Sequence, residues 1–422
     1  MNLKTLRQDI YKALEQAPIE AETVIRACMQ VRKELMELDA ESLPLSVSPG
    51  QLSMAVRQLE EGSLRRSMAL AFGPGWEREC SGGLKDAALY QEDGRSYGQK
   101  WRPLGVLLHI GAGNMPGLSA FSALEGLLTG NVNLVKLPGQ GDRVSMWLLN
   151  RLVKAEPAIG NFLRIFPISS QNQEQLQALI RLSDGVVVWG GTEAVSALRR
   201  LTPPDTRLIE WGHKLSFCYL SPWGLGEAEL DQSLRDLAWH MGRTGQRLCS
   251  SCQGIFVDTE DPSACEALGR RLLPLLREAQ TAWDKQLFPG GGRQKAGLGL
   301  QLYTRELELS RRAGHLLRDG LCAVEIKDRP SLSPSLQLCS CWIAPLPRRL
   351  LIRRLRSYKG LLQTASLICG EEHKEALTNA LVSGGVVRVT QAADMSDPYQ
   401  GEPHDGEFGM RKLVRRVSWR IE

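Results

Sequence analysis

Between residues 105 and 211, short apolar runs alternate with stretches whose apolar residues recur at helical spacing. The runs predict strands at 105–110, 132–137, 162–168, 185–190 and 207–211, and the stretches predict helices at 117–128, 143–153, 173–182 and 193–201. Strands that alternate with helices of this length are joined by right-handed crossovers. The pattern therefore predicts an α/β fold with a largely parallel, doubly wound sheet.

Glycine-containing segments follow several of these strands. GAGN follows the first strand, LPGQG the second and GGTE the fourth. Ligands of doubly wound sheets bind at the carboxyl ends of the strands, so function is expected at these segments. The turn at Gly111 to Gly113 lacks the third glycine and the acidic residue of a dinucleotide fingerprint. Gly113 nevertheless lets a ligand approach the backbone closely.

The pattern differs on either side of this region. The first hundred residues are mainly helical, with breaks at Pro44 and Pro49. After an apolar run at 215–221, a predicted helix ends near Gly242 or Gly245 and leaves QRLCSSCQ on a turn. The basic stretch 348–359 (RRLLIRRLRSYK) predicts an amphipathic helix, either solvated or a docking face for an acidic carrier protein or a phosphorylated substrate.

Composition narrows the class of protein. A chain of 422 residues is expected to form two domains. The formal net charge of +5 is small and the basic residues are scattered, which argues against a nucleic-acid partner. No apolar run reaches the roughly 18 residues of a membrane span, and the first residues lack a signal peptide's apolar region. We expect a cytoplasmic protein whose ten cysteines are thiols.

Cys249 is the first candidate for chemistry. A thiol on a turn after a helix is exposed, and nearby backbone N–H groups can activate it. Three alternatives stay open from the residues alone. Cys249 can be a small core residue, a zinc ligand with Cys252 and the distant pair Cys339 and Cys341, or half of a redox pair with Cys252.

Asn114 and Glu210 are the next candidates. Asn114 follows the first predicted strand, where its amide can donate to a developing oxyanion or simply bond the backbone of its own turn. Glu210 ends the fifth predicted strand, where a carboxylate can act as a general base or form a surface ion pair.

Taken together, these segments resemble the LuxC-type acyl-thioester reductases, a branch of the aldehyde dehydrogenase superfamily. The resemblance runs from about Pro103 to the end of the chain. Its segments are PLGVLLHIGAGNMPG (103–117), LLTGNVNLVKLPG (127–139), VVWGGTEA (187–194), RLIEWGHKLSF (207–217), GQRLCSSCQ (245–253), LLQTASL (361–367) and EPHDG (402–406).

The resemblance implies catalytic roles. Cys249 looks like the family's nucleophile, and Asn114 looks like its oxyanion-hole side chain, working with the backbone N–H of Cys249. Glu210 occupies the superfamily's general-base position. Where the family pattern leads us to expect a proline, this chain has Cys252. A tolerated substitution explains this, and a reversible Cys249–Cys252 disulfide that switches activity off is the sharper hypothesis.

The resemblance also implies a nicotinamide cofactor. Lys136 falls where the superfamily places a lysine against the adenosine ribose, and it would meet the 2′-phosphate of NADPH; NADH is the alternative. Gly190 and Gly191 would open a helix beneath the pyrophosphate, where N–H groups and the helix dipole favour an anion. No metal is implied.

The implied activity is NADPH-dependent reduction of an acyl thioester to the aldehyde through an acyl-cysteine. The donor would be acyl-CoA or a protein-bound fatty acyl group, with an acyl-protein synthetase or acyl carrier protein as a partner. The fold would be aldehyde dehydrogenase-like, with a Rossmann-like cofactor domain at 1–240, a catalytic domain at 241–395, and a segment at 396–422 that contacts another subunit of a homo-oligomer. The alternatives are an acyl-phosphate reductase, a cofactor-free cysteine acyltransferase or thioesterase, and an inactive scaffold.

Overall fold

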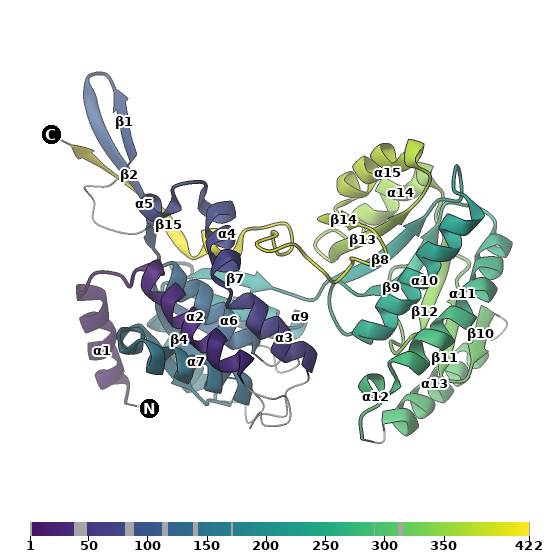
Figure 1. Cartoon of the computed structure of the whole chain (residues 1–422), viewed down its shortest axis with the longest axis horizontal. Coiled ribbons are helices and arrows are strands. Elements are labelled where there is room, and N and C mark those ends of the chain that lie inside the picture. Colours follow the sequence, from purple (N-terminus) through teal and green to yellow (C-terminus); the bar gives the residue numbers. More distant parts are fainter. Residues whose placement is uncertain are drawn as a thin grey trace. The chain divides into compact units, whose positions relative to one another are not determined.

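The computed structural model describes residues 2–37, 49–80, 88–111, 117–137, 142–169, 172–290, 292–310 and 315–421. The chain forms two compact units (Figure 1). The first unit contains Met1–Gly212 and Tyr399–Glu422, and the second contains His213–Pro398.

The centre of the first unit is a five-stranded sheet in the order β5-β4-β3-β6-β7, and every neighbouring pair is parallel. Its strands are β3 (Val106–Ile110), β4 (Val132–Lys136), β5 (Leu163–Phe166), β6 (Gly185–Trp189) and β7 (Arg207–Trp211). All five predicted strands are confirmed. From β3 the chain adds β4 and β5 on one side of the sheet, and then adds β6 and β7 on the other side of β3. The direction of strand addition therefore reverses between β3 and β6. A reversal of this kind opens a crevice at the carboxyl ends of the two strands.

Helices cover both faces of this sheet. They are α6 (Leu118–Leu128), α7 (Arg143–Ala155), α8 (Gln173–Arg181) and α9 (Thr192–Leu201), with a short 3₁₀ helix η2 (Pro157–Asn161) before β5. Ser122 of α6 hydrogen-bonds to His109 of β3, whereas Arg199 of α9 pairs with Glu210 of β7. In the strand register, His109 aligns with Val187 and Val187 aligns with Ile209, the residue before Glu210. Successive residues of a strand face opposite sides of the sheet, so His109 and Glu210 point to opposite faces. The sheet is therefore doubly wound, as predicted.

The described residues of the first hundred form five helices and one feature that the pattern missed. The helices are α1 (Leu3–Glu15), α2 (Ala21–Met36), α3 (Pro49–Gln58), α4 (Glu61–Phe72) and α5 (Trp76–Cys80). They are followed by an antiparallel hairpin of β1 (Ala88–Glu92) and β2 (Arg95–Pro103). The two residues between these strands are Asp93 and Gly94, both at positive φ. Asp-Gly between two strand-like segments is a strong hairpin signal, so this turn could have been predicted from the sequence.

The C-terminal segment completes the first unit. After the short helix α16 (Gly409–Lys412), strand β15 (Val414–Ile421) pairs antiparallel with β2 from Ser96 to Pro103. We expected residues 396–422 as a separate segment; the structure instead joins Tyr399–Glu422 to the first unit through this pairing. Contact of this segment with another subunit stays a prediction.

The second unit is built on a seven-stranded sheet in the order β10-β11-β12-β9-β8-β13-β14. Its strands are β8 (Leu215–Leu220), β9 (Cys252–Val257), β10 (Leu316–Asp319), β11 (Cys322–Ile326), β12 (Cys341–Pro345), β13 (Leu362–Ile368) and β14 (Arg388–Thr390). Only β10, at the edge, pairs antiparallel. We expected the boundary near residue 240, but it falls between Gly212 and His213, because β8 pairs with β9 and β13.

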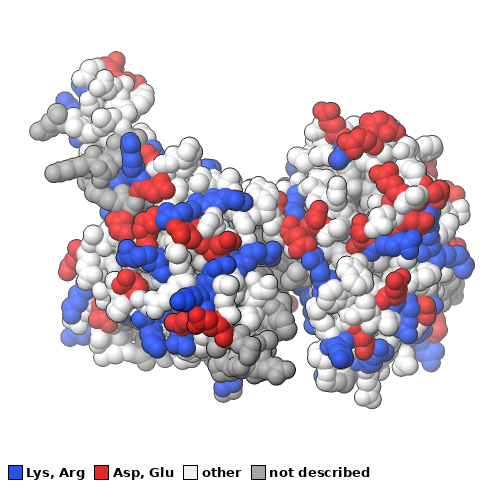
Figure 2. Space-filling model, in the orientation of Figure 1, with Lys and Arg blue, Asp and Glu red and all other residues white. Residues whose placement is uncertain are grey.

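Helices also cover the second sheet. They are α10 (Glu227–Thr244), α11 (Pro262–Ala282), α12 (Asp284–Leu287), α13 (Gly292–Leu309), α14 (Arg348–Arg356) and α15 (Glu371–Gly384). The basic stretch forms α14, which buries Leu351 and Leu355. Within the described residues, no helix is long and apolar enough to cross a membrane. Figure 2 shows side chains of both charges interspersed over the visible face of each unit, as the small net charge implies.

A buried polar network lies beneath α6 in the first unit. His109 is 1 % exposed, and its two ring nitrogens lie 2.8 Å from Ser122 Oγ and 2.9 Å from Asn133 Oδ1. The indole N–H of Trp189 donates to the same Ser122 oxygen at 3.1 Å. Burial lowers the pKa of His109 to about 4, against the opposing hydrogen bond with Asn133. The network therefore favours a neutral imidazole.

We predict that His109 makes the stability of the first unit depend on pH. Its folded pKa of about 4 lies below the ordinary value of 6.5, so between these values the unfolded chain binds a proton that the folded chain does not. The free energy of unfolding should fall as pH drops from about 6.5 toward 4, by up to about 3 kcal/mol from this group. Urea unfolding across this range should show a shallower fall for His109→Gln than for the parent. Equal slopes in the two proteins would contradict the prediction.

Candidate active site

Cys249 lies on the turn between α10 and β9. Helix α10 ends at Thr244, because Gly245 takes the left-handed conformation (φ 56°) and Gln246 follows at φ 58°. The chain then turns through residues 247–251 into β9. Cys249 is the exposed cysteine of the ten; the other nine are buried or half-buried. The thiol of Cys249 is therefore exposed to solvent on a short turn between the end of α10 and the start of β9.

The side chain of Gln246 holds the two ends of this turn together. It is 1 % exposed. Its amide nitrogen donates to the carbonyl oxygens of Cys252 and Ser340, both at 2.9 Å, and lies 3.2 Å from Ser335 Oγ. Its amide oxygen accepts from the backbone N–H groups of Cys339 and Ser340 at 3.0 and 3.2 Å. One side chain therefore fixes the turn against both β9 and the segment that precedes β12.

Ser216 fixes the middle of the turn. Its hydroxyl, fully buried in β8, donates to the carbonyl oxygen of Cys249 at 2.7 Å and accepts from the backbone N–H of Thr364 in β13 at 3.0 Å. Sequence reasoning found neither Ser216 nor Gln246. Ser216 carries no recognisable signal within its apolar run, whereas Gln246 lies inside the segment GQRLCSSCQ that carried the family resemblance.

Cys252 does not share the environment of Cys249. Its side chain is fully buried, its thiol donates to the carbonyl oxygen of Gly254 at 3.3 Å, and burial raises its pKa to about 12. A protonated thiol that faces the core is poorly placed to form the hypothesised disulfide with Cys249. The zinc alternative also finds no support, because no group of three or more His, Cys, Asp or Glu residues in the described parts of the chain is arranged to hold a metal.

The first unit places Lys136 and Glu210 on one face at one edge of its sheet. In the strand register, Lys136 neighbours Ile110, Ile110 neighbours Val188, and Val188 neighbours Glu210. Side chains in one such row share a face, so Lys136 and Glu210 lie three strand spacings apart, roughly 14 Å. Lys136 is 3 % exposed, and burial lowers its pKa. The row lies at the carboxyl ends of the strands, where ligands of such sheets bind.

Gly190 and Gly191 lie at the same edge, between β6 and α9. The N–H of Gly190 donates to the carbonyl oxygen of Trp211 at 3.2 Å. Helix α9 begins at Thr192 with Gly191 as its N-cap, and no side chain caps its first N–H groups. A Cβ built on Gly191 would meet nothing within 4 Å. This helix start has the N–H groups and the open approach that an anion requires.

Glu210 is held in an ion pair. Its Oε1 accepts from Arg199 Nε at 2.9 Å, and its Oε2 accepts from a terminal nitrogen of the same guanidinium. The side chain of Glu210 is 23 % exposed and that of Arg199 is 69 % exposed. A surface ion pair was the alternative to a general base in the prediction for Glu210. Arg199 contacts both carboxylate oxygens of Glu210, so the ion pair and an incoming proton would compete for the same negative charge.

Gly113, Asn114 and His404 are the remaining residues that the sequence singled out. Gly113 and Asn114 lie outside the described residues. His404, in the EPHDG segment, packs against the indoles of Trp189 and Trp211 with ring centroids 5.2 and 5.0 Å away. Its position is therefore beside the last residues of β6 and β7.

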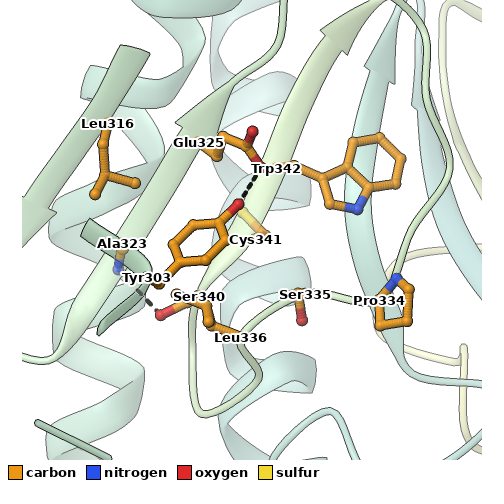
Figure 3. Close-up of a pocket in the computed structure, with 10 residues that line it drawn as sticks. All are labelled: Tyr303, Leu316, Ala323, Glu325, Pro334, Ser335, Leu336, Ser340, Cys341 and Trp342. Carbon is orange, nitrogen blue, oxygen red and sulfur yellow. Dashed lines mark hydrogen bonds between the residues drawn. The ribbon is translucent and has the colours of Figure 1, made fainter. Parts of the chain in front are cut away.

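A small cavity in the second unit is lined by residues of α13, β10, β11, β12 and the segment that precedes β12 (Figure 3). Its volume is about 80 Å³. Tyr303 donates to Glu325 Oε2 at 2.6 Å on one side, and Ser335 and Ser340, which also bond Gln246, form part of the wall. Ligand pockets typically enclose about 300–1,000 Å³, so this cavity is too small for an acyl substrate.

We predict that Cys252 plays no part in oxidative inactivation. A Cys252→Ser variant should lose activity to peroxide at the parent's rate and recover as fully with thiol reductant, because the buried thiol is protonated and bonded to Gly254. A thiol-reactive maleimide should label one site quickly in both proteins, and Cys249→Ser should remove that fast phase. Slower inactivation or weaker recovery of Cys252→Ser would restore the disulfide hypothesis.

Comparisons with known proteins agree with this architecture. A family model described as "Acyl-CoA reductase (LuxC)" matches residues 84–416. A long-chain acyl-protein thioester reductase of Aliivibrio fischeri is 22% identical over 336 residues, which cover 76% of this chain and 64% of the relative. One from Photorhabdus laumondii is 26% identical over 191 residues, 42% of this chain and 39% of the relative. The chain thus spans less than two thirds of the length of these curated relatives.

Solved structures of low sequence identity share the fold. Aldehyde dehydrogenase 21 from Physcomitrella patens superposes with a TM-score of 0.71 at 12% identity, over 100% of this chain and 91% of that one. Lactaldehyde dehydrogenase from Escherichia coli superposes with a TM-score of 0.64 at 14% identity, over 98% and 91% of the two chains. The expected aldehyde dehydrogenase-like fold is confirmed. With a family model that matches most of its length, this chain belongs to the LuxC acyl-CoA reductase family.

Proposed function

We propose that this protein reduces an acyl thioester to the aldehyde, with Cys249 as the covalent nucleophile and NADPH as the reductant. The observation that carries the proposal is the single exposed thiol, on a turn whose backbone is anchored by Gln246 and Ser216. Membership of the LuxC family supports the same chemistry, as does the activity after which the curated relatives are named.

The carboxyl edge of the first sheet fits a dinucleotide. Gly190 and Gly191 open α9 without a side-chain cap, which suits a pyrophosphate, and Lys136 brings a cation to the same edge. Lys136 would contact the adenosine ribose and favour NADPH over NADH by pairing with the 2′-phosphate. We include Gly113, which follows β3 in the sequence, in the same proposed site. When bound, the reduced nicotinamide would supply the hydride that the acyl carbon accepts.

The residues of this chain perform the other steps. The thiolate of Cys249 attacks the thioester carbonyl, and the tetrahedral oxyanion accepts hydrogen bonds from the Asn114 amide and the backbone N–H of Cys249. The carrier thiolate leaves and takes a proton, and the acyl group remains on Cys249. After the acyl carbon is reduced, the thiohemiacetal breaks its C–S bond, which releases the aldehyde and regenerates the thiol. An oxyanion donor of this kind contributes about 10²–10³ in rate.

Glu210 serves as the general base that takes the proton of the Cys249 thiol. Its carboxylate is bound to Arg199, and we propose that this ion pair opens when Glu210 takes the proton. A paired carboxylate between turnovers has one advantage for a thioester reductase: it does not activate water against the acyl-cysteine.

The acyl donor is acyl-CoA or a protein-bound acyl group, and an acyl-protein synthetase or acyl carrier protein would deliver the latter. The curated relatives are named for the reduction of acyl-protein thioesters, which supports a protein-bound donor. We further propose a homo-oligomer.

The first test follows cofactor oxidation with a panel of acyl-CoA thioesters. Acyl-dependent oxidation of NADPH, with aldehyde as the product, should occur with the parent and be absent from Cys249→Ala. Cys369→Ala, which removes a half-buried thiol, should keep the parent's activity. NADH should support a lower kcat/KM than NADPH. Thioester cleavage without cofactor would indicate an acyltransferase or thioesterase, and turnover of acyl phosphates alone would indicate an acyl-phosphate reductase.

A pair of variants separates the two roles of Glu210. If Glu210 is the general base, Glu210→Gln should lower kcat by about 10²-fold or more, whereas Arg199→Gln should leave kcat near or above that of the parent. The reason is that Arg199 only restrains the carboxylate. If Glu210 serves only the ion pair, the two variants should lose similar, small amounts of stability and keep similar kcat values. Thermal unfolding and initial rates on the same preparations decide between these outcomes.

A further inference from the structure

Helix α14 and the turn after it carry four exposed basic side chains. Within the described part of the chain, none of Arg353, Arg354, Arg356 and Lys359 forms an ion pair or a side-chain hydrogen bond, and all four are exposed. We call these four residues the basic face. The amino-terminal half of the helix differs, because Arg348 pairs with Asp258 and Arg349 pairs with Glu260.

The segments beside the basic face bring no carboxylate to it. Gly384 of α15 packs against Leu355, and the last nine residues of α15, ALTNALVSG, contain no acid. On the other side, Tyr358 accepts a hydrogen bond from the backbone N–H of Leu332, in the segment 329–338 (RPSLSPSLQL), which is also free of acids. The positive charge is therefore left uncompensated.

The basic face lies at the same edge of the second sheet as Cys249. The turn after α14 leads into β13, where the N–H of Leu215 in β8 donates to the carbonyl oxygen of Leu361 at 2.7 Å. The next residue of β8, Ser216, bonds the carbonyl oxygen of Cys249. Since β8 lies between β9 and β13, the starts of the strands that follow Cys249 and α14 are two strand spacings apart, roughly 10 Å.

The chemistry of this surface suits a protein better than a free phosphate. The cations project from the outside of a helix near its carboxyl end, where the helix dipole disfavours a bound anion. Arginines in the last turn of a helix are commonly explained by their favourable interaction with the helix dipole. Lys359 lies beyond the end of α14, so the dipole does not explain its presence. Exposed apolar side chains, Ile352 (45 % exposed) and Leu361 (38 % exposed), lie among the cations. A surface of arginine and apolar side chains is typical of protein interfaces.

We propose that the basic face docks an acidic carrier protein that bears the acyl group as a thioester. This inference rests on the proposed thioester reduction at Cys249. An acidic surface around the carrier's thioester arm would pair with Arg353, Arg356 and their neighbours and direct the arm toward the edge where Cys249 lies. The attraction raises the rate of productive encounter and leaves the chemical step unchanged.

The test compares three donors of one hexadecanoyl group: acyl carrier protein, coenzyme A and free pantetheine. The variant is Arg353→Gln with Arg356→Gln, which keeps helix-forming side chains. The control is Arg235→Gln with Lys295→Gln, which removes the same charge from exposed residues of α10 and α13. At low ionic strength, kcat/KM for the acyl carrier protein should fall about tenfold in the variant and stay unchanged in the control. Activity with acyl-pantetheine should be equal in all three proteins.

Salt provides a second readout. The parent's kcat/KM with acyl carrier protein should fall steeply as ionic strength rises, and the variant should lose most of that dependence. Equal losses with all donors would assign the arginines a structural role and overturn the proposal. A loss confined to acyl-CoA would make the face a nucleotide phosphate site, and a parent that uses acyl carrier protein no better than acyl-pantetheine would also overturn it. Absence of turnover with every donor would instead count against the proposed function.

Discussion

The buried amide of Gln246 is the interaction on which the position of the exposed thiol depends. It contacts β9 through the carbonyl of Cys252 and contacts the start of β12 through Cys339 and Ser340. A buried backbone group left without its partner costs about 1–3 kcal/mol, so the turn has few other conformations available. Three consecutive residues at positive φ, Gln337 to Cys339, point the N–H groups of the facing segment toward this amide. The backbone strain of that segment is thus offset by hydrogen bonds to one side chain.

Differences in burial make the ten cysteines unequal in reactivity. The thiols of Cys218, Cys252 and Cys341 are fully or almost fully buried in the second sheet, and burial raises the pKa of each. Their neighbourhood is apolar core, so they behave as small hydrophobic side chains. The selectivity for Cys249 therefore comes in large part from the burial or partial burial of the other nine thiols.

The sequence was most informative where side-chain periodicity and local turns decide the structure. The five parallel strands of the first unit, the end of α10 near Gly245 and the start of α9 after Gly191 were all predictable from local pattern. The features that it missed depend on partners distant in the chain. Strand β8 belongs to the second unit because it pairs with β9 and β13, and Ser216 matters because Cys249 folds back onto it. Neither partner can be identified from spacing.

The pairing of β15 with β2 gives the chain a particular order of assembly. The second unit is inserted between two parts of the first, and the last strand must return across that insertion to join a strand near residue 100. On the ribosome, domains usually fold as they emerge. The second unit can complete its sheet from one continuous stretch of chain, whereas β2 has only β1 beside it until β15 is made. During synthesis, the sheet that contains β2 is therefore completed only after the whole second unit has left the ribosome.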